Sequence, residues 1–231
     1  RYPLCACRPD IEYFVESTGV LSNGREVLQA WEYFVVALLD ELGIERAVLV
    51  GGSMGGRVAA EVAVVYPERV AGLMLIAAAR GGHDWSAAVQ AMWQRESDAL
   101  NAGDLDAAVQ VNLSFWLDGP ERERANLGDD DRALVVAMQR RAFELELAHP
   151  DAAQESRRED VFDRVGEITM PTTVLFGSDD PPDIAGIARW YKTEMPHASL
   201  HEISNAAHLP SLEQPEQCTA LLRALLDRIS W

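Results

Sequence analysis

The sequence has few cysteines and no long run of apolar residues. Three cysteines, an odd number, do not make a disulfide framework. Cys5 and Cys7 lie close together, but no second pair of ligands follows nearby, so we expect free thiols and no metal site. No apolar run approaches the length of a membrane-spanning helix, and the first residues lead us to expect no signal peptide. These absences favour a cytoplasmic protein that works without a metal or a cofactor.

Basic residues are also scarce. The 231 residues include 37 Asp and Glu against 20 Lys and Arg, which gives a net charge of −17. Because nucleic acids and anionic membranes attract clustered Lys and Arg, this balance argues against both as partners. The chain shows no internal repeat and no low-complexity linker, and its length suits one large domain or a core with an insertion.

One stretch near residue 53 organises the chain, namely Gly51-Gly52-Ser53-Met54-Gly55-Gly56. An aliphatic run at 47–50 predicts a buried strand before it, and a helical pattern starts at its end. A serine on so sharp a turn needs glycine two residues away on each side, because side chains at Gly51 and Gly55 would collide with the strand and the helix. We therefore predict that Ser53 is a nucleophile presented on this turn.

The start of the following helix suits an anion that forms at Ser53. Its backbone N–H groups and partial positive charge would face that anion, and the Met54 N–H is the expected oxyanion donor. A purely structural turn and a phosphate-binding loop are the alternatives. The phosphate loop would need Lys followed by Ser or Thr after the last glycine, whereas the chain has Arg57 and Val58 there.

Strands and helices alternate on both sides of a long helical stretch. The apolar patterns predict helices at 26–42, 54–66, 184–194 and the C-terminus, and strands at 47–50, 70–78, 172–176 and 199–203. Strand, helix and strand in this order imply right-handed crossovers and a mostly parallel, doubly wound sheet of the α/β class. Residues 1–25 fit one or two further strands, for example at 11–16.

Residues 81–170 differ from the alternating segments around them, because their apolar patterns are helical and include no convincing strand. We predict that they form an all-helical lid inserted into an α/β core of residues 1–80 and 171–231. The Trp and Met residues of this segment are best interpreted as packing between its helices. Its charged runs at 121–124 and 157–160 are best interpreted as solvated surface.

A serine nucleophile needs a base and a group that orients the base. In open parallel sheets such groups lie in loops at the carboxyl ends of strands, where His208 follows the last predicted strand and Asp180 the one before. The chain order of serine, acid and histidine is the one expected after a nucleophile elbow. His83 is the alternative base. Asp179 and Asp183 compete as the acid, although Asp183 could cap the helix that follows it.

Three segments of the chain resemble the alpha/beta hydrolase superfamily. They are Gly51-Gly52-Ser53-Met54-Gly55-Gly56, Phe176-Gly177-Ser178-Asp179-Asp180 and Ala206-Ala207-His208-Leu209-Pro210. The resemblance covers residues 26–231, and the helical lid stands where that family places its cap. In the family the catalytic acid follows the strand-ending glycine by three residues, which implies Asp180 rather than Asp179.

The resemblance implies a serine hydrolase of a small apolar carboxylic ester or lactone. Ser53 would attack the carbonyl, His208 would carry the proton, and Asp180 would orient His208. Two other functions stay open: hydrolysis of a carbon–carbon bond in a diketone-like acid, and ligand binding by an inactive homologue. A homo-oligomer also stays open.

Residues 1–46 depart from the family pattern. They hold no His-Gly pair, the feature that in the family precedes the elbow and supplies the second oxyanion donor. We therefore expect a shortened or altered start to the fold and slow ester hydrolysis by the chain as written.

Overall fold

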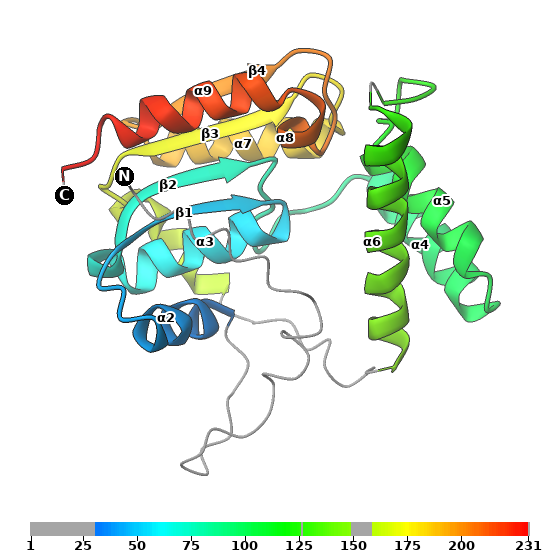
Figure 1. Cartoon of the computed structure of the whole chain (residues 1–231), viewed down its shortest axis with the longest axis horizontal. Coiled ribbons are helices and arrows are strands. Elements are labelled where there is room, and N and C mark those ends of the chain that lie inside the picture. Colours follow the sequence, from blue (N-terminus) through cyan, green and yellow to red (C-terminus); the bar gives the residue numbers. More distant parts are fainter. Residues whose placement is uncertain (1–30, 126, 149–158, 231) are drawn as a thin grey trace, which may run out of the picture.

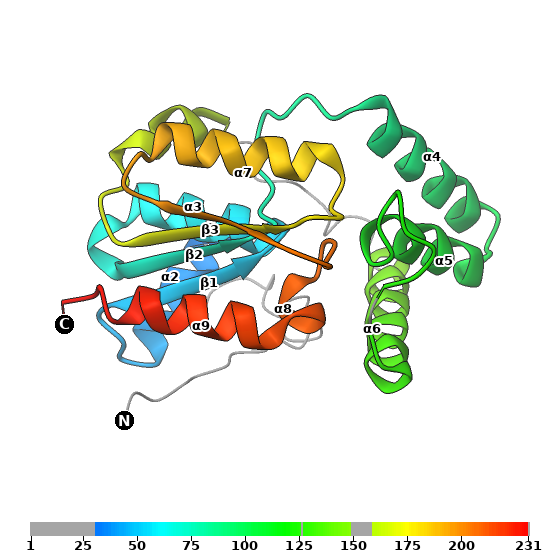
Figure 2. The same ribbon diagram turned by 90° about the horizontal axis from the view of Figure 1, so that it is seen from above.

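Four parallel strands form the sheet of this protein (Figures 1 and 2). The computed structural model describes residues 31–125, 127–148 and 159–230. The strands are β1 (Ala47–Gly52), β2 (Val70–Ile76), β3 (Thr172–Gly177) and β4 (Ser199–Ile203), in the spatial order β1-β2-β3-β4. The predicted parallel α/β sheet is confirmed. The strands expected within residues 1–25 lie outside the described residues.

Helices cover both faces of the sheet, as Figure 2 shows. The core helices are α2 (Trp31–Glu41), α3 (Met54–Val65), α7 (Pro182–Glu194), α8 (Pro210–Glu213) and α9 (Pro215–Leu226), with a short 3-10 turn η1 (Pro67–Arg69). Helices α3 and α7 pack against one face, and α9 packs against the other. A sheet covered on both faces needs strands that are apolar throughout, and every residue of β2 is buried.

The alternation of side chains along each strand divides the core into two layers. Leu73 and Leu75 of β2 pack in the cluster that contains α3 and α7. Met74 and Ile76 point the other way, into the cluster that contains α9. Successive side chains of a strand face opposite sides, so one apolar run supplies both layers.

Between β2 and β3 the described residues form helices and no strand. The elements are α4 (Ala87–Asn101), α5 (Leu105–Trp116), α6 (Asp129–Ala148) and the 3-10 segment η3 (Glu159–Glu167). Helices α4, α5 and α6 lie beyond the carboxyl ends of the strands (Figures 1 and 2). Segment η3 differs from them, because Val161, Phe162 and Val165 are buried in the core cluster with α3. The division of the chain into a core and a lid stays a prediction.

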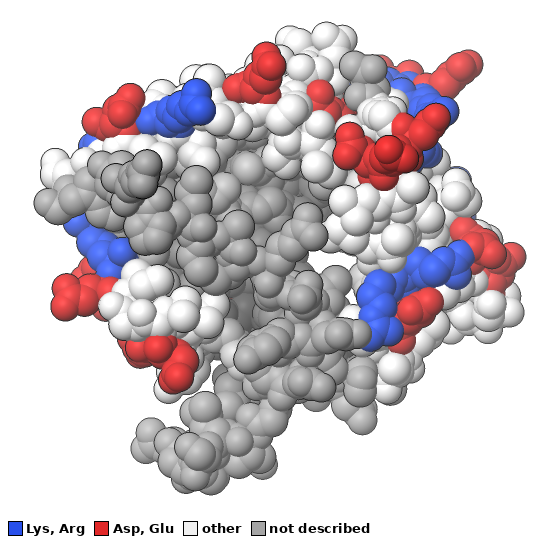
Figure 3. Space-filling model, viewed as in Figure 1, with Lys and Arg blue, Asp and Glu red and all other residues white. Residues whose placement is uncertain are grey.

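Charged side chains of both signs lie next to one another around the face shown in Figure 3. Between β2 and β3, Arg124 pairs with Asp129, and Arg140 pairs with Asp106. Within the described residues, none of the helices combines the length and the apolar character that crossing a membrane requires.

Asp118 is a buried carboxylate that joins the chain after α5 to helix α6. Its two oxygens accept hydrogen bonds from Arg132 Nη1 at 2.6 Å and Nη2 at 2.9 Å, and one of them also accepts from the Ala125 N–H at 2.8 Å. Burial by itself raises the pKa of Asp118, but the bonds from Arg132 and Ala125 outweigh it and hold this pKa below its ordinary value of 3.8.

We predict that Asp118→Asn destabilises the protein by about 1–3 kcal/mol at neutral pH, since a charge-assisted pair is lost. The lowered pKa means that the ionised carboxylate stabilises the fold above its ordinary pKa of 3.8, and that this contribution disappears as the pH falls through the folded-state pKa. The gap between wild type and variant should therefore shrink between pH 7 and about pH 3, measured by urea unfolding. Asp129→Asn, in an exposed pair, is the control. A gap that is the same at both pH values would contradict the prediction.

Candidate active site

Ser53 follows the end of β1 in a strained conformation. Its φ of 51° and ψ of −119° lie in a region that side chains rarely adopt. Four hydrogen bonds hold this backbone. The Ser53 N–H donates to the Ile76 carbonyl at 2.9 Å, and the Ser53 carbonyl accepts from the N–H groups of Gly56 at 3.0 Å, Ala79 at 3.1 Å and Arg57 at 3.2 Å. The elbow is thus fixed by its own helix and by the neighbouring strand β2.

The glycines around Ser53 do not all have the role expected of them. A Cβ at Gly51 would lie 2.2 Å from the Gly55 carbonyl oxygen, and one at Gly56 would lie 2.5 Å from the Ala78 Cβ. A Cβ at Gly55 would meet nothing within 4 Å. The expected collision is confirmed at Gly51 and is wrong at Gly55. The close contact on the helix side falls on Gly56, because the first turn of α3 packs there against the chain after β2.

We predict that Gly51→Ala and Gly55→Ala differ sharply in stability. The first forces a methyl group into backbone and should cost at least about 1–3 kcal/mol. The second adds a methyl group in open space near the start of a helix, where alanine is favoured by up to about 1 kcal/mol. Urea unfolding of the two variants beside wild type measures this difference. Equal losses of stability would show that Gly51 is not tightly packed.

Three side chains meet at the carboxyl ends of β1, β3 and β4. His208 Nε2 lies 2.8 Å from Ser53 Oγ, and His208 Nδ1 lies 2.8 Å from Asp180 Oδ1. The second Asp180 oxygen accepts from the Gly177 N–H at 3.3 Å. The Asp180 side chain is fully buried and His208 is 8 % exposed. With the proton on Nδ1, His208 donates to Asp180 and presents Nε2 as an acceptor to the Ser53 hydroxyl.

The alternative base and one alternative acid pair with each other instead. His83 Nε2 lies 3.2 Å from Asp183 Oδ1, which also accepts from the Ser86 N–H at 2.8 Å. Burial alone raises the pKa of Asp183, but the bonds from Ser86 and His83 outweigh it and lower this pKa. Asp183 does not cap α7 as suggested above, because Pro181 occupies the N-cap position. The structure thus brings together Ser53, His208 and Asp180, whose catalytic roles stay predictions.

Trp116, at the end of α5, touches His208 directly. The centres of the two rings lie 4.6 Å apart, and the Trp116 carbonyl accepts a hydrogen bond from the backbone N–H of His208 at 3.1 Å. The sequence interpretation of Trp116 as lid packing missed this contact. Helical periodicity assigns a tryptophan to a face of a helix and does not identify the loop that the face meets.

Tyr191 of α7 contacts the segment that holds the elbow, a role that the sequence analysis did not predict. Its hydroxyl donates to the Ala79 carbonyl at 3.0 Å, and the Ala79 N–H donates to the Ser53 carbonyl. Burial raises the pKa of Tyr191, which keeps the hydroxyl neutral and able to donate.

Met54 is the first residue of α3, so its N–H has no acceptor within the helix. That position suits the oxyanion donor predicted above, and the role stays a prediction. The expected lack of a second donor in residues 1–46 rests largely on residues 1–30, which lie outside the described part of the chain. The apolar pocket that we expect between lid and core likewise stays a prediction.

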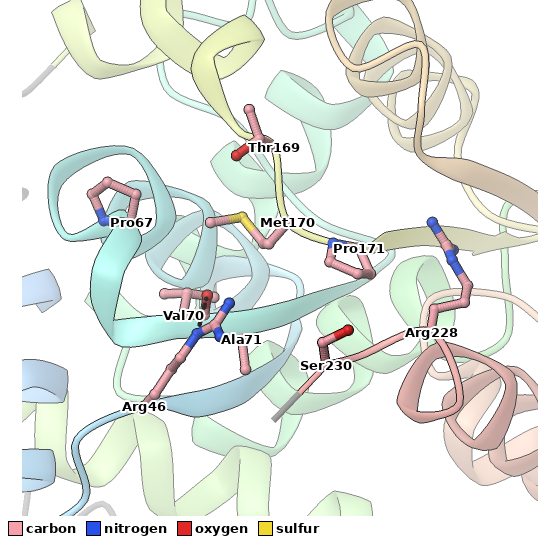
Figure 4. Close-up of a pocket in the computed structure, with 9 residues that line it drawn as sticks. All are labelled: Arg46, Pro67, Val70, Ala71, Thr169, Met170, Pro171, Arg228 and Ser230. Atoms are coloured by element: carbon pink, nitrogen blue, oxygen red, sulfur yellow. Dashed lines mark hydrogen bonds between the residues drawn. The ribbon is translucent and has the colours of Figure 1, made fainter.

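A cavity of about 410 Å³ lies at the other end of the sheet (Figure 4). Its walls include Arg46 before β1, Val70 at the start of β2 and Pro171 before β3. These residues mark the amino ends of the strands, whereas Ser53 follows the carboxyl end of β1. The cavity is therefore separate from the Ser53 site. Across the residues that the structure describes, no group of three or more His, Cys, Asp or Glu side chains is placed to hold a metal ion.

Comparison with known proteins gives consistent matches. A family model for the alpha/beta hydrolase fold matches residues 28–215. A 2-hydroxy-6-oxononadienedioate/2-hydroxy-6-oxononatrienedioate hydrolase of Cupriavidus pinatubonensis is 32% identical over 200 residues, which cover 82% of this chain. The chain spans 64% of that relative's length. A 3-oxoadipate enol-lactonase 1 of Acinetobacter baylyi is 24% identical over 215 residues, covering 93% of this chain and 74% of the relative.

Solved structures with the same fold include Est816, described as an N-acyl homoserine lactone degrading enzyme. It matches with a TM-score of 0.63 and 25% identity, covering 85% of this chain and 74% of its own. The enol-lactonase of Burkholderia xenovorans matches with a TM-score of 0.64 and 21% identity, covering 87% of this chain and 76% of its own. The second likeness is evidence of fold alone.

Proposed function

Since this chain belongs to the alpha/beta hydrolase fold family, we propose that it is a serine hydrolase of small carboxylic esters or lactones. The observation that carries this proposal is the hydrogen-bonded chain from Ser53 through His208 to Asp180, with two contacts of 2.8 Å. A serine hydroxyl is a poor nucleophile at neutral pH unless a base takes its proton, and this chain of contacts supplies the base and its orienting group.

In the first half of the reaction, Ser53 Oγ attacks the carbonyl carbon while His208 Nε2 takes the hydroxyl proton. The carbonyl oxygen becomes an oxyanion, which the Met54 N–H at the start of α3 stabilises. Asp180, fully buried and bonded to Nδ1, stabilises the imidazolium without taking its proton. The intermediate collapses when His208 returns the proton to the leaving alkoxide oxygen, which leaves an acyl group on Ser53.

Water completes the second half. His208 Nε2 takes a proton from the water as its oxygen attacks the acyl carbon, and the proton then returns to Ser53 Oγ as the acyl bond breaks. An ester thereby yields a carboxylic acid and an alcohol, and a lactone yields one hydroxy acid. Every proton transfer uses Nε2, which faces Ser53, while Nδ1 keeps its proton and its hydrogen bond to Asp180.

A second candidate function is hydrolysis of a carbon–carbon bond next to a ketone. The identity of 32% across 82% of the chain to the Cupriavidus hydrolase favours it. That reaction also adds water to a carbonyl carbon, but its leaving group is carbon and not oxygen. The site must therefore deliver a proton to a carbon atom, a demand that a simple ester does not make.

The first test is substitution of the three side chains, assayed with an activated p-nitrophenyl ester. We predict that Ser53→Ala and His208→Gln lower kcat by about 10³- to 10⁶-fold, and Asp180→Asn by about 10⁴-fold, because the residues act as one unit. His83→Gln and Asp183→Asn are the matched controls, since they form a His–Asp contact outside the Ser53 site. Loss of activity in His83→Gln with retention in His208→Gln would reverse the assignment of the base.

A second experiment separates the candidate functions. Wild type is offered an activated ester, a simple lactone and a 2-hydroxy-6-oxo-dienoate, and we predict the highest kcat/KM with the ester or the lactone. A kcat/KM about 100-fold higher for the dienoate would make carbon–carbon hydrolysis the better assignment. Absence of turnover and of fluorophosphonate labelling, with ligand binding unaltered by Ser53→Ala, would identify an inactive binding protein.

A further inference from the structure

A turn of the lid, residues 117–122, packs against the two loops that carry Asp180 and His208. It directly follows Trp116. The Trp116 carbonyl accepts a hydrogen bond from the backbone N–H of His208, and the Trp116 ring lies against the imidazole. The turn closes on itself, because Arg122 Nε donates to the Asp118 carbonyl at 2.6 Å and Arg122 Nη2 donates to the Leu117 carbonyl at 3.0 Å. The Arg122 side chain is therefore held by its own turn.

Gly119 shows how closely this turn approaches the two loops. Its φ is +85°, and an added Cβ would lie 2.6 Å from the Asp179 carbonyl oxygen and 3.4 Å from the Ala207 Cβ. Asp179 precedes the proposed acid and Ala207 precedes the proposed base. The turn thus lies in contact with both loops at the positions next to the reacting side chains.

Arg122 joins the same two loops by charge. Its Nη1 lies 3.2 Å from Asp179 Oδ2, and its Nη2 lies 2.9 Å from Glu213 Oε2. The other Glu213 oxygen accepts the Ala207 N–H at 2.7 Å. A continuous path of contacts therefore runs from the neighbour of Asp180, through Arg122 and Glu213, to the neighbour of His208.

Two groups on this path, Arg122 and Glu213, are largely or fully buried. The Glu213 side chain has no exposed surface, and the Arg122 side chain is only 17% exposed, so the interpretation of residues 121–124 as solvated surface is wrong at Arg122. A buried carboxylate is stable only when a cation or hydrogen-bond donors compensate it. The planar guanidinium reaches two carboxylates at once, which a single ammonium group does less well.

We propose that Arg122 is a positioning residue by which the lid holds the acid and base loops together, so that docking of the lid completes the Ser53 site. The inference rests on the proposed function, and it adds that the lid contributes to the chemical step as well as to substrate choice. A shift of about 1 Å between catalytic groups can cost about 100-fold in rate. The contact at risk is the 2.8 Å one between His208 Nδ1 and Asp180 Oδ1.

The test uses the whole chain with four variants at these positions. Arg122→Met removes the ion pairs with Asp179 and Glu213, and Arg122→Lys keeps the positive charge without the planar guanidinium that reaches both carboxylates. Arg122→Met combined with Glu213→Gln removes the bridge and the buried charge together, while the Gln oxygen still accepts the Ala207 N–H. Arg124→Met is the matched control, because Arg124 is in the same run and its ion pair with Asp129 is exposed.

We predict that Arg122→Met lowers kcat for a p-nitrophenyl ester by about 10- to 100-fold with little change in KM, since the reacting groups are displaced and the substrate contacts are not. Arg122→Lys should recover part of this loss, and Arg124→Met should match wild type. The double variant should regain the thermal stability that Arg122→Met loses and stay slow. If Arg122→Met alone does not fold, the double variant still tests the positioning role, because it lacks the buried unpaired charge.

A second readout follows the geometry without turnover. The proton between His208 Nδ1 and Asp180 should give a downfield NMR resonance in wild type that broadens or disappears in Arg122→Met and in the double variant. Wild-type turnover in the double variant would overturn the inference, because Arg122 would then only neutralise Glu213. Equal behaviour of Arg122→Met and Arg124→Met would overturn it as well. If wild type neither hydrolyses esters nor reacts with a fluorophosphonate, the proposed function fails, and the resonance still decides the positioning role.

Discussion

The structure of this site depends on one imidazole that is bonded at both ring nitrogens. His208 can accept from Ser53 and donate to Asp180 only if three loops, at the ends of β1, β3 and β4, stay in register. A parallel sheet meets this requirement, because its strands all end at the same edge. The strained backbone of Ser53 adds the last constraint, since it turns the hydroxyl toward that edge.

The helical segment between β2 and β3 contacts the loops of His208 and Asp180 directly. Trp116 precedes the turn of residues 117–122 that meets the loops of His208 and Asp180, Arg122 ends it, and both residues make polar contacts with those loops. A second His–Asp contact, between His83 and Asp183, joins the chain that follows β2 to the first turn of α7. The segment between β2 and β3 is thus bonded to the rest of the protein near Ser53 and again close to the end of β2.

Local packing explains why the elbow tolerates strain. Four backbone hydrogen bonds fix Ser53, and the buried Tyr191 hydroxyl holds the Ala79 segment that supplies one of them. Gly51 and Gly56 allow the strand and the helix to approach within contact of each other. The strain at one residue is therefore balanced by bonds and close packing spread over β2, α3 and α7.

The sequence by itself determined the alternation of strands and helices, the elbow at Ser53, and the identity of the three side chains that meet. Apolar periodicity and glycine placement are local properties, the order of serine, acid and histidine follows from the nucleophile elbow, and the family resemblance favoured Asp180 over Asp179. Only the tertiary structure decided which glycine beside Ser53 is crowded, that Asp183 pairs with His83, and that Arg122 is mostly buried. These features depend on which distant segments come into contact. The sequence pattern alone predicts that a charged residue such as Arg122 is exposed, because its partners Asp179 and Glu213 are distant in the chain and only the fold brings them to it.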